Sequence, residues 1–479
     1  MCELRVSENQ PKAHFIGLCG AGMSAVAHLL QRRGYEVSGS DDGFYPPVSD
    51  YLTRIGLVLE PGYRASNIPA DVELIVIGKN ARLVPETNEE VALALDQYRD
   101  KVKSFPEVLA DLSVESERIV VAGSYGKSTL TSMIAWVLIH AGNDPSWFIG
   151  AIPKNFDHSS GLGKGTFVFE GDEYPSANWD DRAKFLHYDP STVVLTSACH
   201  DHVNIYPTLE SYHKPFVALL QGLKKRDGRL IACTGEDNAR AFYEAYPGER
   251  VSYALGRPAD WTAEDIALGE ISSFTLVHEG EQLGTIETSL LGRHNIENIT
   301  GAAACLIGGG FVTLEEFRAG IARYNGIERR LDRKTDKSLL PVYEGFGSSY
   351  EKARSAITAL KEHYKDRRLT ILFEPHTFTW RNRAALSQYA TVFDGAARIW
   401  LYAPPTQGAG THDQVTLDEI HAEAVKHYDD VRTFDAESYK TILTDADPAG
   451  DVVLILSSGS FDGLLKKVIA EAELRYPVL

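Results

Sequence analysis

The sequence predicts an α/β protein with three domains. Strands and helical segments alternate along almost the whole chain, which is the pattern of α/β folds. The length of 479 residues corresponds to about three domains at roughly 150 residues each, and each domain can bury its own core. We expect the domains to cover residues 1–110, 111–325 and 326–479.

The composition excludes several classes of protein. Net charge is −18, and an acidic excess of this size argues against a nucleic-acid or anionic-membrane binder. It does not exclude an anionic substrate, because a local basic pocket can outweigh the overall field. No apolar run approaches the roughly 18 residues that a membrane helix needs, and the polar N-terminus does not resemble a signal peptide.

Cysteine usage indicates the compartment. Five cysteines are widely spaced, their number is odd, and no CxxC pair occurs. A disulfide framework and a zinc knuckle are therefore not expected, and a reducing cytoplasm is the natural location.

The first domain opens with a glycine turn between a strand and a helix. The expected elements are a strand at His14–Leu18, a helix at Met23–Arg33, and strands at Tyr35–Ser38 and Val72–Ile77. The turn contains Gly20 and Gly22, and Ser40 and Asp41 follow the second strand. This is the pattern of a dinucleotide fingerprint, which would make an NAD(P) oxidoreductase, although Ala25 stands where a third glycine belongs. The same geometry can hold the diphosphate of a UDP-sugar at the helix start near Met23, with Asp41 at the nucleoside.

A phosphate loop is the strongest local signal. The strand Arg118–Ala122 leads directly into Gly123-Ser124-Tyr125-Gly126-Lys127-Ser128-Thr129, and a helix follows through Ile139. Glycines let backbone N–H groups face phosphates, and the helix start adds favourable partial charge. We expect Lys127 to neutralise the β- and γ-phosphates of ATP and Ser128 to ligate Mg²⁺. Only two residues separate the glycines, where the usual motif has four.

Two polar turns after buried strands could supply metal ligands. Glu170-Gly171-Asp172-Glu173 follows a strand at Thr166–Phe169, and carboxylates at a strand end suit a hard cation. Cys199-His200-Asp201-His202 follows a strand at Thr192–Thr196 and could also bind metal. Each turn taken alone is also compatible with an ordinary solvated loop.

The remaining elements complete the α/β pattern. In the second domain we expect strands at Arg229–Ala232, Phe274–His278 and Gly284–Ser289, the last two as an antiparallel pair, and helices at His294–Ile307 and Leu314–Arg323. In the third domain we expect strands at Pro341–Tyr343, Leu369–Phe373, Arg398–Tyr402 and Val452–Leu456, with helices at Tyr350–His363 and Gly463–Leu474.

The order of these parts resembles that of the Mur ligase family. A fold that binds a nucleotide diphosphate comes first, an ATP loop follows, and a third α/β domain comes last. The similarity covers nearly the whole chain: HFIGLCGAGMSAVAHLLQRRGYEVSGSD resembles the UDP-binding segment, and VAGSYGKSTLTSMIAWVL the ATP loop. EGDEY and the spacing from Asp180 to Pro190 are similar to the branch that adds a whole peptide. GRHNIENITGA and IERRLD resemble the family's segments near the ATP base and at the entry to the third domain.

The resemblance implies a fold and a reaction. The fold would be a Rossmann-like UDP-binding domain, a central P-loop ATPase domain with a mostly parallel sheet, and a Rossmann-like C-terminal domain. The reaction would be ATP-dependent phosphorylation of a carboxylate on UDP-N-acetylmuramate, followed by attack of a peptide or amino-acid amine. The implied site residues are Lys127 at the transferred phosphate, Ser128, Glu170 and His202 at Mg²⁺, His294, Asn295, Asn298 and Arg330 at ATP, and Glu374, His376 and Arg381 at the amine substrate.

Three segments depart from the family pattern. Tyr125 replaces a histidine of the loop, and Cys199 replaces a glutamate before the metal histidine. Residues 344–350 read EGFGSSY where the family has an aspartate and two histidines. An alternative interpretation is therefore a catalytically weak Mur-ligase-like protein that binds nucleotide or UDP-sugar for another purpose.

Overall fold

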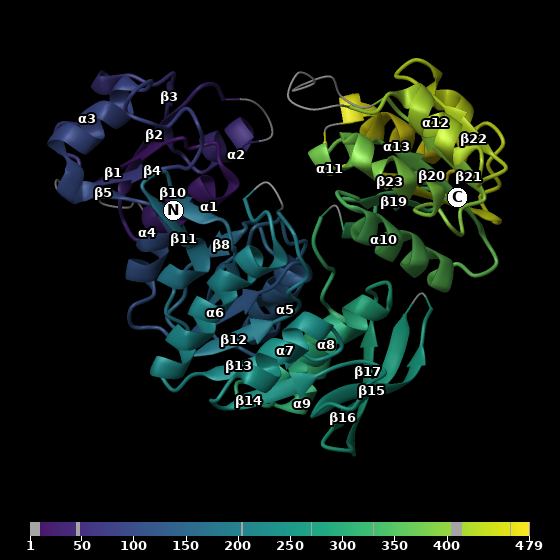
Figure 1. Cartoon of the computed structure of the whole chain (residues 1–479), viewed down its shortest axis with the longest axis horizontal. Helices are drawn as coiled ribbons and strands as arrows, with labels where there is room; N and C mark the ends of the chain where they lie inside the picture. The colour runs from purple at the N-terminus through teal and green to yellow at the C-terminus, as the bar shows by residue number, and fades with distance from the viewer. Residues whose placement is uncertain are drawn as a thin grey trace. The chain divides into compact units, whose positions relative to one another are not determined.

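The computed structural model describes residues 10–44, 48–202, 205–269, 271–328, 330–403, 414–459 and 461–478. The chain divides into two compact units (Figure 1). The first unit comprises Met1–Glu264, Thr275–Gly284 and Glu297–Tyr324, and the second comprises Asp265–Phe274, Thr285–Ile296 and Asn325–Leu479.

The first sheet is a five-stranded parallel sheet in the order β3-β2-β1-β4-β5. Its strands are β1 (Lys12–Ile16), β2 (Glu36–Asp41), β3 (Val58–Pro61), β4 (Leu74–Ile77) and β5 (Val102–Lys103). Its helices are α1 (Ala21–Arg32), α2 (Val48–Arg54), α3 (Glu89–Gln97) and α4 (Phe105–Leu112), with 3₁₀ turns at Ala65–Asn67 and Arg99–Lys101. The strand order reverses between β1 and β4, and ligands of open α/β sheets bind at such a switch point, where α1 begins here.

The central sheet has ten strands in the order β17-β16-β15-β14-β13-β12-β6-β9-β7-β8. The strands are β6 (Arg118–Ala122), β7 (Ser146–Phe148), β8 (Ser160–Gly161), β9 (Phe167–Gly171), β12 (Thr192–Leu195), β13 (Arg229–Cys233), β14 (Arg250–Tyr253), β15 (Trp261–Ala267), β16 (Ser272–His278) and β17 (Glu281–Thr288). The helices are α5 (Lys127–His140), α6 (Leu209–Lys225), α7 (Asp237–Ala245), α8 (Arg293–Leu306) and α9 (Leu314–Ala322), with a 3₁₀ turn at Lys184–His187.

The register of the central sheet gathers three loops at one edge. Ala122 at the end of β6 pairs with Gly171 of β9 on one side and with Leu195 of β12 on the other. All three strands are parallel, so the segments that follow them leave from the same edge. The phosphate loop, the acidic turn and the His202 segment are therefore neighbours.

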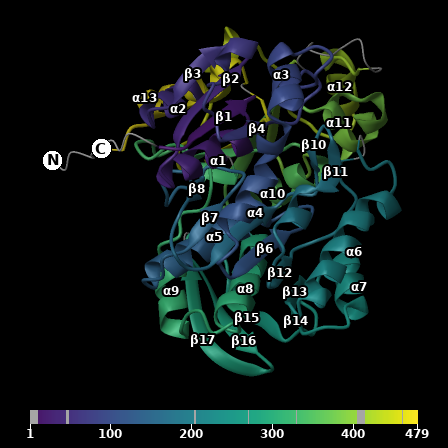
Figure 2. The same cartoon turned by 90° about the vertical axis from the view of Figure 1, so that its left-hand side faces the viewer.

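A hairpin of the central region holds the first sheet in place. It consists of β10 (Pro175–Ala177) and β11 (Asp180–Ala183), and Figure 2 shows it beside β4. At its tip, the Asn178 amide donates to the carbonyls of Asn80 (2.9 Å) and Leu83 (2.8 Å). Trp179 packs against the core cluster beneath β4, with the Arg99 guanidinium 5.6 Å from its ring centroid. The first sheet and strands β6 to β14 thereby belong to one compact unit.

The third sheet lies in the second unit and has six strands in the order β18-β19-β23-β20-β21-β22. The strands are β18 (Arg330–Arg333), β19 (Val342–Gly345), β20 (Arg368–Phe373), β21 (Arg398–Leu401), β22 (Val431–Thr433) and β23 (Asp451–Leu456), and β18 alone among these runs antiparallel to its neighbour. The helices are α10 (Tyr350–His363), α11 (Phe378–Arg381), α12 (Leu417–Ala424) and α13 (Leu464–Arg475), with 3₁₀ turns at Arg383–Ala390, Ser438–Leu443 and Phe461–Gly463. Along β23, Leu454 and Leu456 face one core and Val453 and Ile455 the other, so the sheet is covered on both faces.

The predicted α/β class is confirmed, and most predicted elements lie within two residues of their observed bounds. The first domain also contains β3, β5 and α2–α4, which we had not predicted. The domain boundaries at residues 110 and 325 stay predictions. Within the described parts of the chain, no helix is long and apolar enough to cross a membrane.

Candidate active site

The phosphate loop joins β6 to α5 through two glycines with positive φ, +143° at Gly123 and +83° at Gly126. A Cβ on Gly123 would lie 2.2 Å from the Thr196 hydroxyl, so only glycine fits there. The N–H groups of Ser124 and Tyr125 both donate to the Ser197 hydroxyl, at 3.0 and 3.1 Å. The loop therefore presents consecutive backbone donors, as an anion site requires.

A buried ionic chain runs from the loop to His202. The ammonium of Lys127, the first residue of α5, contacts the Glu173 carboxylate at 3.0 Å and donates to the Gly123 carbonyl. The other oxygen of Glu173 lies 3.1 Å from Nε2 of His202 and accepts the Tyr212 hydroxyl at 3.1 Å. Nδ1 of His202 contacts the Tyr174 hydroxyl at 3.0 Å. The structure thus brings Lys127 and His202 together through a residue that we had not assigned to the site.

The surroundings of Glu173 and Lys127 favour the charged forms of both side chains. Burial raises the pKa of Glu173, but the charge of Lys127 and the hydrogen bond to His202 outweigh burial and lower that pKa to about 2. Burial lowers the pKa of Lys127, but Glu173 together with the nearby Asp172 and Glu170 raises it above its ordinary value. Both groups are ionised at neutral pH, so the Lys127 cation lies at the base of the phosphate loop.

Two side chains with oxygen donors for a metal ion lie beside this buried ionic chain. The hydroxyl of Ser128, one residue into α5, donates to Oε1 of Glu170 at 2.8 Å. The second oxygen of Glu170 accepts the N–H of Gly150 at 2.6 Å, which fixes the carboxylate. Hydroxyl and carboxylate oxygens are the donors that Mg²⁺ prefers, so these two residues fit such an ion. Thr129, the next residue along α5, is buried, and its carbonyl accepts the Tyr324 hydroxyl at 3.2 Å.

The residues predicted in the first sheet divide into two groups. Asp41 holds the glycine turn, because its Oδ2 accepts the N–H of Cys19 at 2.7 Å. Gly20 is the N-cap of α1 and lies beside that turn. Gly22 packs closely on Phe105 of α4, since a Cβ there would lie 3.0 Å from that ring.

The other two predicted residues of this sheet are buried in the protein. Met23 is 4% exposed and belongs to the apolar core. Ser40 is completely buried, and its hydroxyl donates to Glu90 at 2.9 Å within a network that also holds His14. Their side chains therefore support the turn.

The residues predicted at the ATP base lie on α8. Asn298 is in the first unit, and its amide oxygen lies against Gly126, 3.0 Å from where a Cβ would stand. His294 and Asn295 are in the second unit, where His294 lies 3.3 Å from the Ser355 hydroxyl and the Asn295 amide donates to the Leu291 carbonyl at 2.8 Å. Arg330 is the first residue of β18, and its side chain lies outside the described residues.

The residues predicted for the amine substrate follow β20. The Glu374 carboxylate is 5% exposed, accepts the Ser457 hydroxyl, and lies 3.5 Å from Nδ1 of His376. Gly459 makes room for the His376 ring, because a Cβ there would lie 2.1 Å from it. Arg381 ends α11, and its carbonyl accepts the N–H of Val415. The ends of β20 and β23 thus bring Glu374 and His376 together.

The departures from the family pattern have distinct surroundings. The Tyr125 side chain is 45% exposed on the loop. The thiol of Cys199 hydrogen-bonds to Glu236. In the 344–350 segment, Glu344 forms an ion pair with Lys334 at 3.0 Å. Gly345 faces apolar side chains, since its Cβ would lie 2.9 Å from Leu456.

Comparisons with known proteins identify the family. A model described as Mur ligase family, catalytic domain, matches residues 12–116, and one described as Mur ligase middle domain matches residues 121–306. The UDP-N-acetylmuramate–L-alanine ligase of Geobacter sulfurreducens is 30% identical over 463 residues, covering 94% of this chain and 95% of the relative. The chain belongs to the Mur ligase family.

Relatives with two different amine substrates resemble this Mur ligase. The UDP-N-acetylmuramate–L-alanyl-γ-D-glutamyl-meso-2,6-diaminoheptandioate ligase of Haemophilus influenzae is 27% identical over 465 residues, covering 96% of this chain and 99% of the relative. The crystal structure of a murein peptide ligase from Psychrobacter arcticus has a TM-score of 0.68 at 25% identity and covers 98% of this chain and 100% of its own. That of a UDP-N-acetylmuramate–alanine ligase from Thermotoga maritima has a TM-score of 0.78 at 19% identity, covering 96% and 98%, and shows the shared three-domain fold.

Proposed function

We propose that this protein is an ATP-dependent ligase that joins a peptide or an amino acid to UDP-N-acetylmuramate in peptidoglycan recycling or biosynthesis. The observation that carries the proposal is the phosphate loop with Lys127 and Ser128 directly beside two carboxylates. The full-length similarity to two kinds of UDP-N-acetylmuramate ligase supports it.

The first chemical step uses the loop to place ATP. The N–H groups of Ser124 and Tyr125 would exchange the Ser197 hydroxyl for phosphate oxygens, and Lys127 would turn from Glu173 toward the transferred phosphoryl group. A carboxylate oxygen of the muramyl lactyl group attacks the γ-phosphorus, the bond to the β-phosphate oxygen breaks, and ADP leaves. The product is an acyl phosphate, which activates a carboxylate that is otherwise a poor electrophile.

The second step forms the amide. The amine attacks the acyl carbon, loses a proton, and inorganic phosphate leaves with the electron pair of the C–O bond. Ser128 and Glu170 would hold Mg²⁺, and His202 a second ion, which when bound would screen the charge of the phosphate oxygens. Arg330, His294, Asn295 and Asn298 would contact ATP, and Glu374, His376 and Arg381 would bind the amine substrate.

A second candidate function is nucleotide or UDP-sugar binding with little catalysis. The 344–350 segment favours it, because the acid that remains there, Glu344, is already paired with Lys334. The segment also carries Ser348 and Ser349 where family members have imidazoles. Such a protein would bind ATP on the loop without completing ligation.

An assay of the purified full-length protein separates the two functions. ATP, Mg²⁺ and UDP-N-acetylmuramate are combined with L-alanine or with L-alanyl-γ-D-glutamyl-meso-diaminopimelate, and phosphate and product mass are measured together. We expect phosphate release equal to amide formation with at least one donor. Nucleotide binding without product for either donor would contradict the ligase and support the second function.

A further inference from the structure

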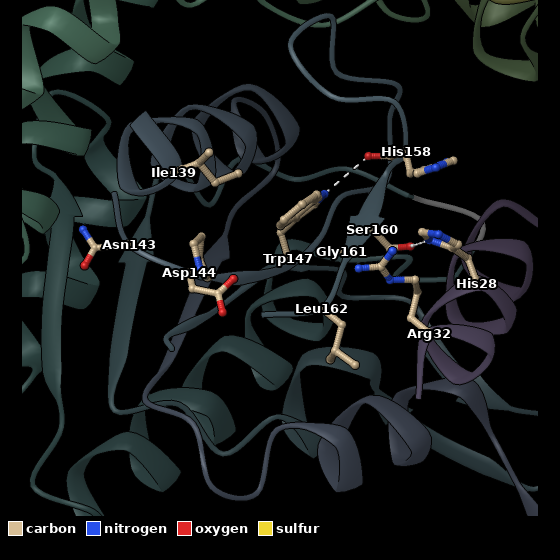
Figure 3. Close-up of a pocket in the computed structure, with 11 residues that line it drawn as sticks. His28, Arg32, Ile139, Asn143, Asp144, Trp147, His158, Ser160, Gly161 and Leu162 are labelled. Atoms are coloured by element: carbon tan, nitrogen blue, oxygen red, sulfur yellow. Dashed lines mark hydrogen bonds between the residues drawn. The ribbon is translucent and has the colours of Figure 1, made fainter. Parts of the chain in front are cut away.

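A pocket of about 330 Å³ lies in the first unit, away from the residues assigned to the proposed reaction. It is lined by α1, by the segment that follows α5, and by β7 and β8 (Figure 3). His28 and Arg32 come from the second half of α1, roughly 10 and 16 Å along the axis from its first residue at 1.5 Å per residue. Ile139 stands near the end of α5, roughly 18 Å from Lys127 by the same measure. The pocket thus lies at the C-terminal ends of the two helices whose N-termini face the proposed phosphate sites.

The Trp147 indole, which forms part of the pocket wall, is held by several contacts. The Trp147 indole packs over Gly161, its partner across the β7–β8 pair, and a Cβ on Gly161 would lie 2.1 Å from that ring. Phe156 stacks on the same indole with ring centroids 5.0 Å apart, and the indole N–H donates to the His158 carbonyl at 3.3 Å. These three contacts fix the position of the indole, so this part of the pocket wall is preformed.

The charges in the pocket are few and are separated. Burial, with the nearby His158 and Arg32, lowers the pKa of His28 to about 4, and burial also lowers the pKa of His158. Both imidazoles are therefore neutral at pH 7, which leaves Arg32 and Asp144 as the charged side chains among the eleven lining residues.

These two charges do not neutralise each other. Figure 3 shows them on opposite sides of the pocket, with Trp147 and Leu162 between them. No ion pair within 4.0 Å joins Arg32 to any residue in the described part of the chain. Asp144 accepts one backbone N–H, that of Lys164 at 3.1 Å, through a single carboxylate oxygen.

We propose that this pocket binds a small zwitterion, an amino acid with an apolar side chain or a dipeptide, whose carboxylate pairs with Arg32 and whose ammonium pairs with Asp144. The guanidinium offers a planar pair of donors that matches a carboxylate. Leu162, Ile139 and the edge of Trp147 give the apolar body of the ligand a surface. The volume is at the lower end of the roughly 300–1,000 Å³ of small-molecule pockets, which fits a ligand of this size. The site is additional to the amine site of the proposed ligase reaction.

Calorimetric titration of the full-length protein, without ATP or UDP-sugar, tests the proposal. The probes are L-leucine and L-alanyl-L-alanine, which distinguish an amino acid from a dipeptide, and N-acetyl-L-leucine and L-leucinamide, which each lack one charge. We expect L-leucine to bind, and binding of L-alanyl-L-alanine as well would extend the ligand class to dipeptides. Either blocked form should bind about tenfold more weakly than L-leucine or not at all, since each loses a charge-assisted hydrogen bond.

Four variants locate the binding. Arg32→Gln and Asp144→Asn should each weaken zwitterion binding about tenfold, and Asp144→Asn keeps an oxygen for the Lys164 N–H. Arg33→Gln and Glu115→Gln are the matched controls: like Arg32 and Asp144 these residues are exposed, but neither lines the pocket, and affinity should not change. Circular dichroism confirms that all four fold. Absence of zwitterion binding in the wild type, equal binding of the blocked forms, or unchanged affinity in either Arg32→Gln or Asp144→Asn would overturn the proposal.

Discussion

Replacing Glu173 with glutamine tests whether the buried ionic chain supports the central sheet. The pKa of Glu173 is lowered from 4.5 to about 2, and each pKa unit corresponds to about 1.4 kcal/mol, so the folded state favours the carboxylate by about 3 kcal/mol. Glutamine keeps the shape but leaves the Lys127 ammonium, 13% exposed, without its nearest counter-charge. Breaking a buried pair in this way costs about 3–5 kcal/mol, so we expect a loss of at least about 3 kcal/mol.

Hydrogen exchange of the full-length protein measures this loss locally. The amides of β6 and β9 should exchange roughly a hundredfold faster in Glu173→Gln than in the wild type at pH 7. Asp181→Asn is the control, because that carboxylate is 98% exposed and its removal should leave these rates unchanged. A difference in exchange rate below about threefold at pH 7 would refute the idea that Lys127 and Glu173 form a stabilising ion pair.

The pH dependence provides a second test with a defined sign. Because the folded-state pKa is depressed, the contribution of Glu173 is fully present above pH 4.5 and is lost as the pH falls toward 2. The ratio of variant to wild-type exchange should therefore shrink by about tenfold between pH 7 and pH 3.5. A ratio that stays constant over this range would show that the effect of the substitution is steric.

Three further predictions concern the proposed sites. Lys127→Ala should lower ATP-dependent phosphate release by about 100-fold or more, since the lost charge stabilises the transferred group. Lys225 is exposed, and Lys225→Ala should match the wild type. Near-normal turnover of Lys127→Ala would contradict the assignment of this loop as the ATP phosphate site. Asp41→Asn should weaken UDP-N-acetylmuramate binding about tenfold in calorimetry, because Asp41 fixes the turn through the Cys19 N–H, and unchanged affinity would place the sugar nucleotide elsewhere. Gly345→Asp, which would recreate the family's aspartate, should destabilise the second unit by about 1–3 kcal/mol in urea denaturation, because the carboxylate would enter the apolar space beside Leu456; an increase in ligation rate without loss of stability would contradict that reasoning.

Much of the candidate site could be predicted from local sequence. Lys127, Ser128 and Glu170 stand at strand ends and a helix start, and parallel pairing of β6 with β9 necessarily brings such positions together. Helix α10 was predicted with its observed bounds, because Ser349 caps its start and apolar residues recur at helical spacing.

Other features depend on contacts that the local sequence does not contain. Which carboxylate of the acidic turn would meet Lys127 could not be read from spacing, because Glu170, Asp172 and Glu173 are all close to it. Ser40 fits a nucleotide-binding pattern, yet its hydroxyl donates a hydrogen bond to Glu90, fifty residues later in the sequence. The edge strands β3 and β5 are short, with four and two residues, and lack the apolar alternation that would identify them.

The hairpin tip at Asn178 has a consequence for the order of events in a reaction cycle. Its amide donates to two carbonyls of the loop that follows β4, so the first and central sheets cannot rotate independently without breaking both hydrogen bonds. A sugar nucleotide held at the start of α1 would therefore reach the phosphate loop with its orientation already restricted. The entropy of alignment would be lost when the first complex forms, before phosphoryl transfer begins, and the barrier of the chemical step would be lower by that amount.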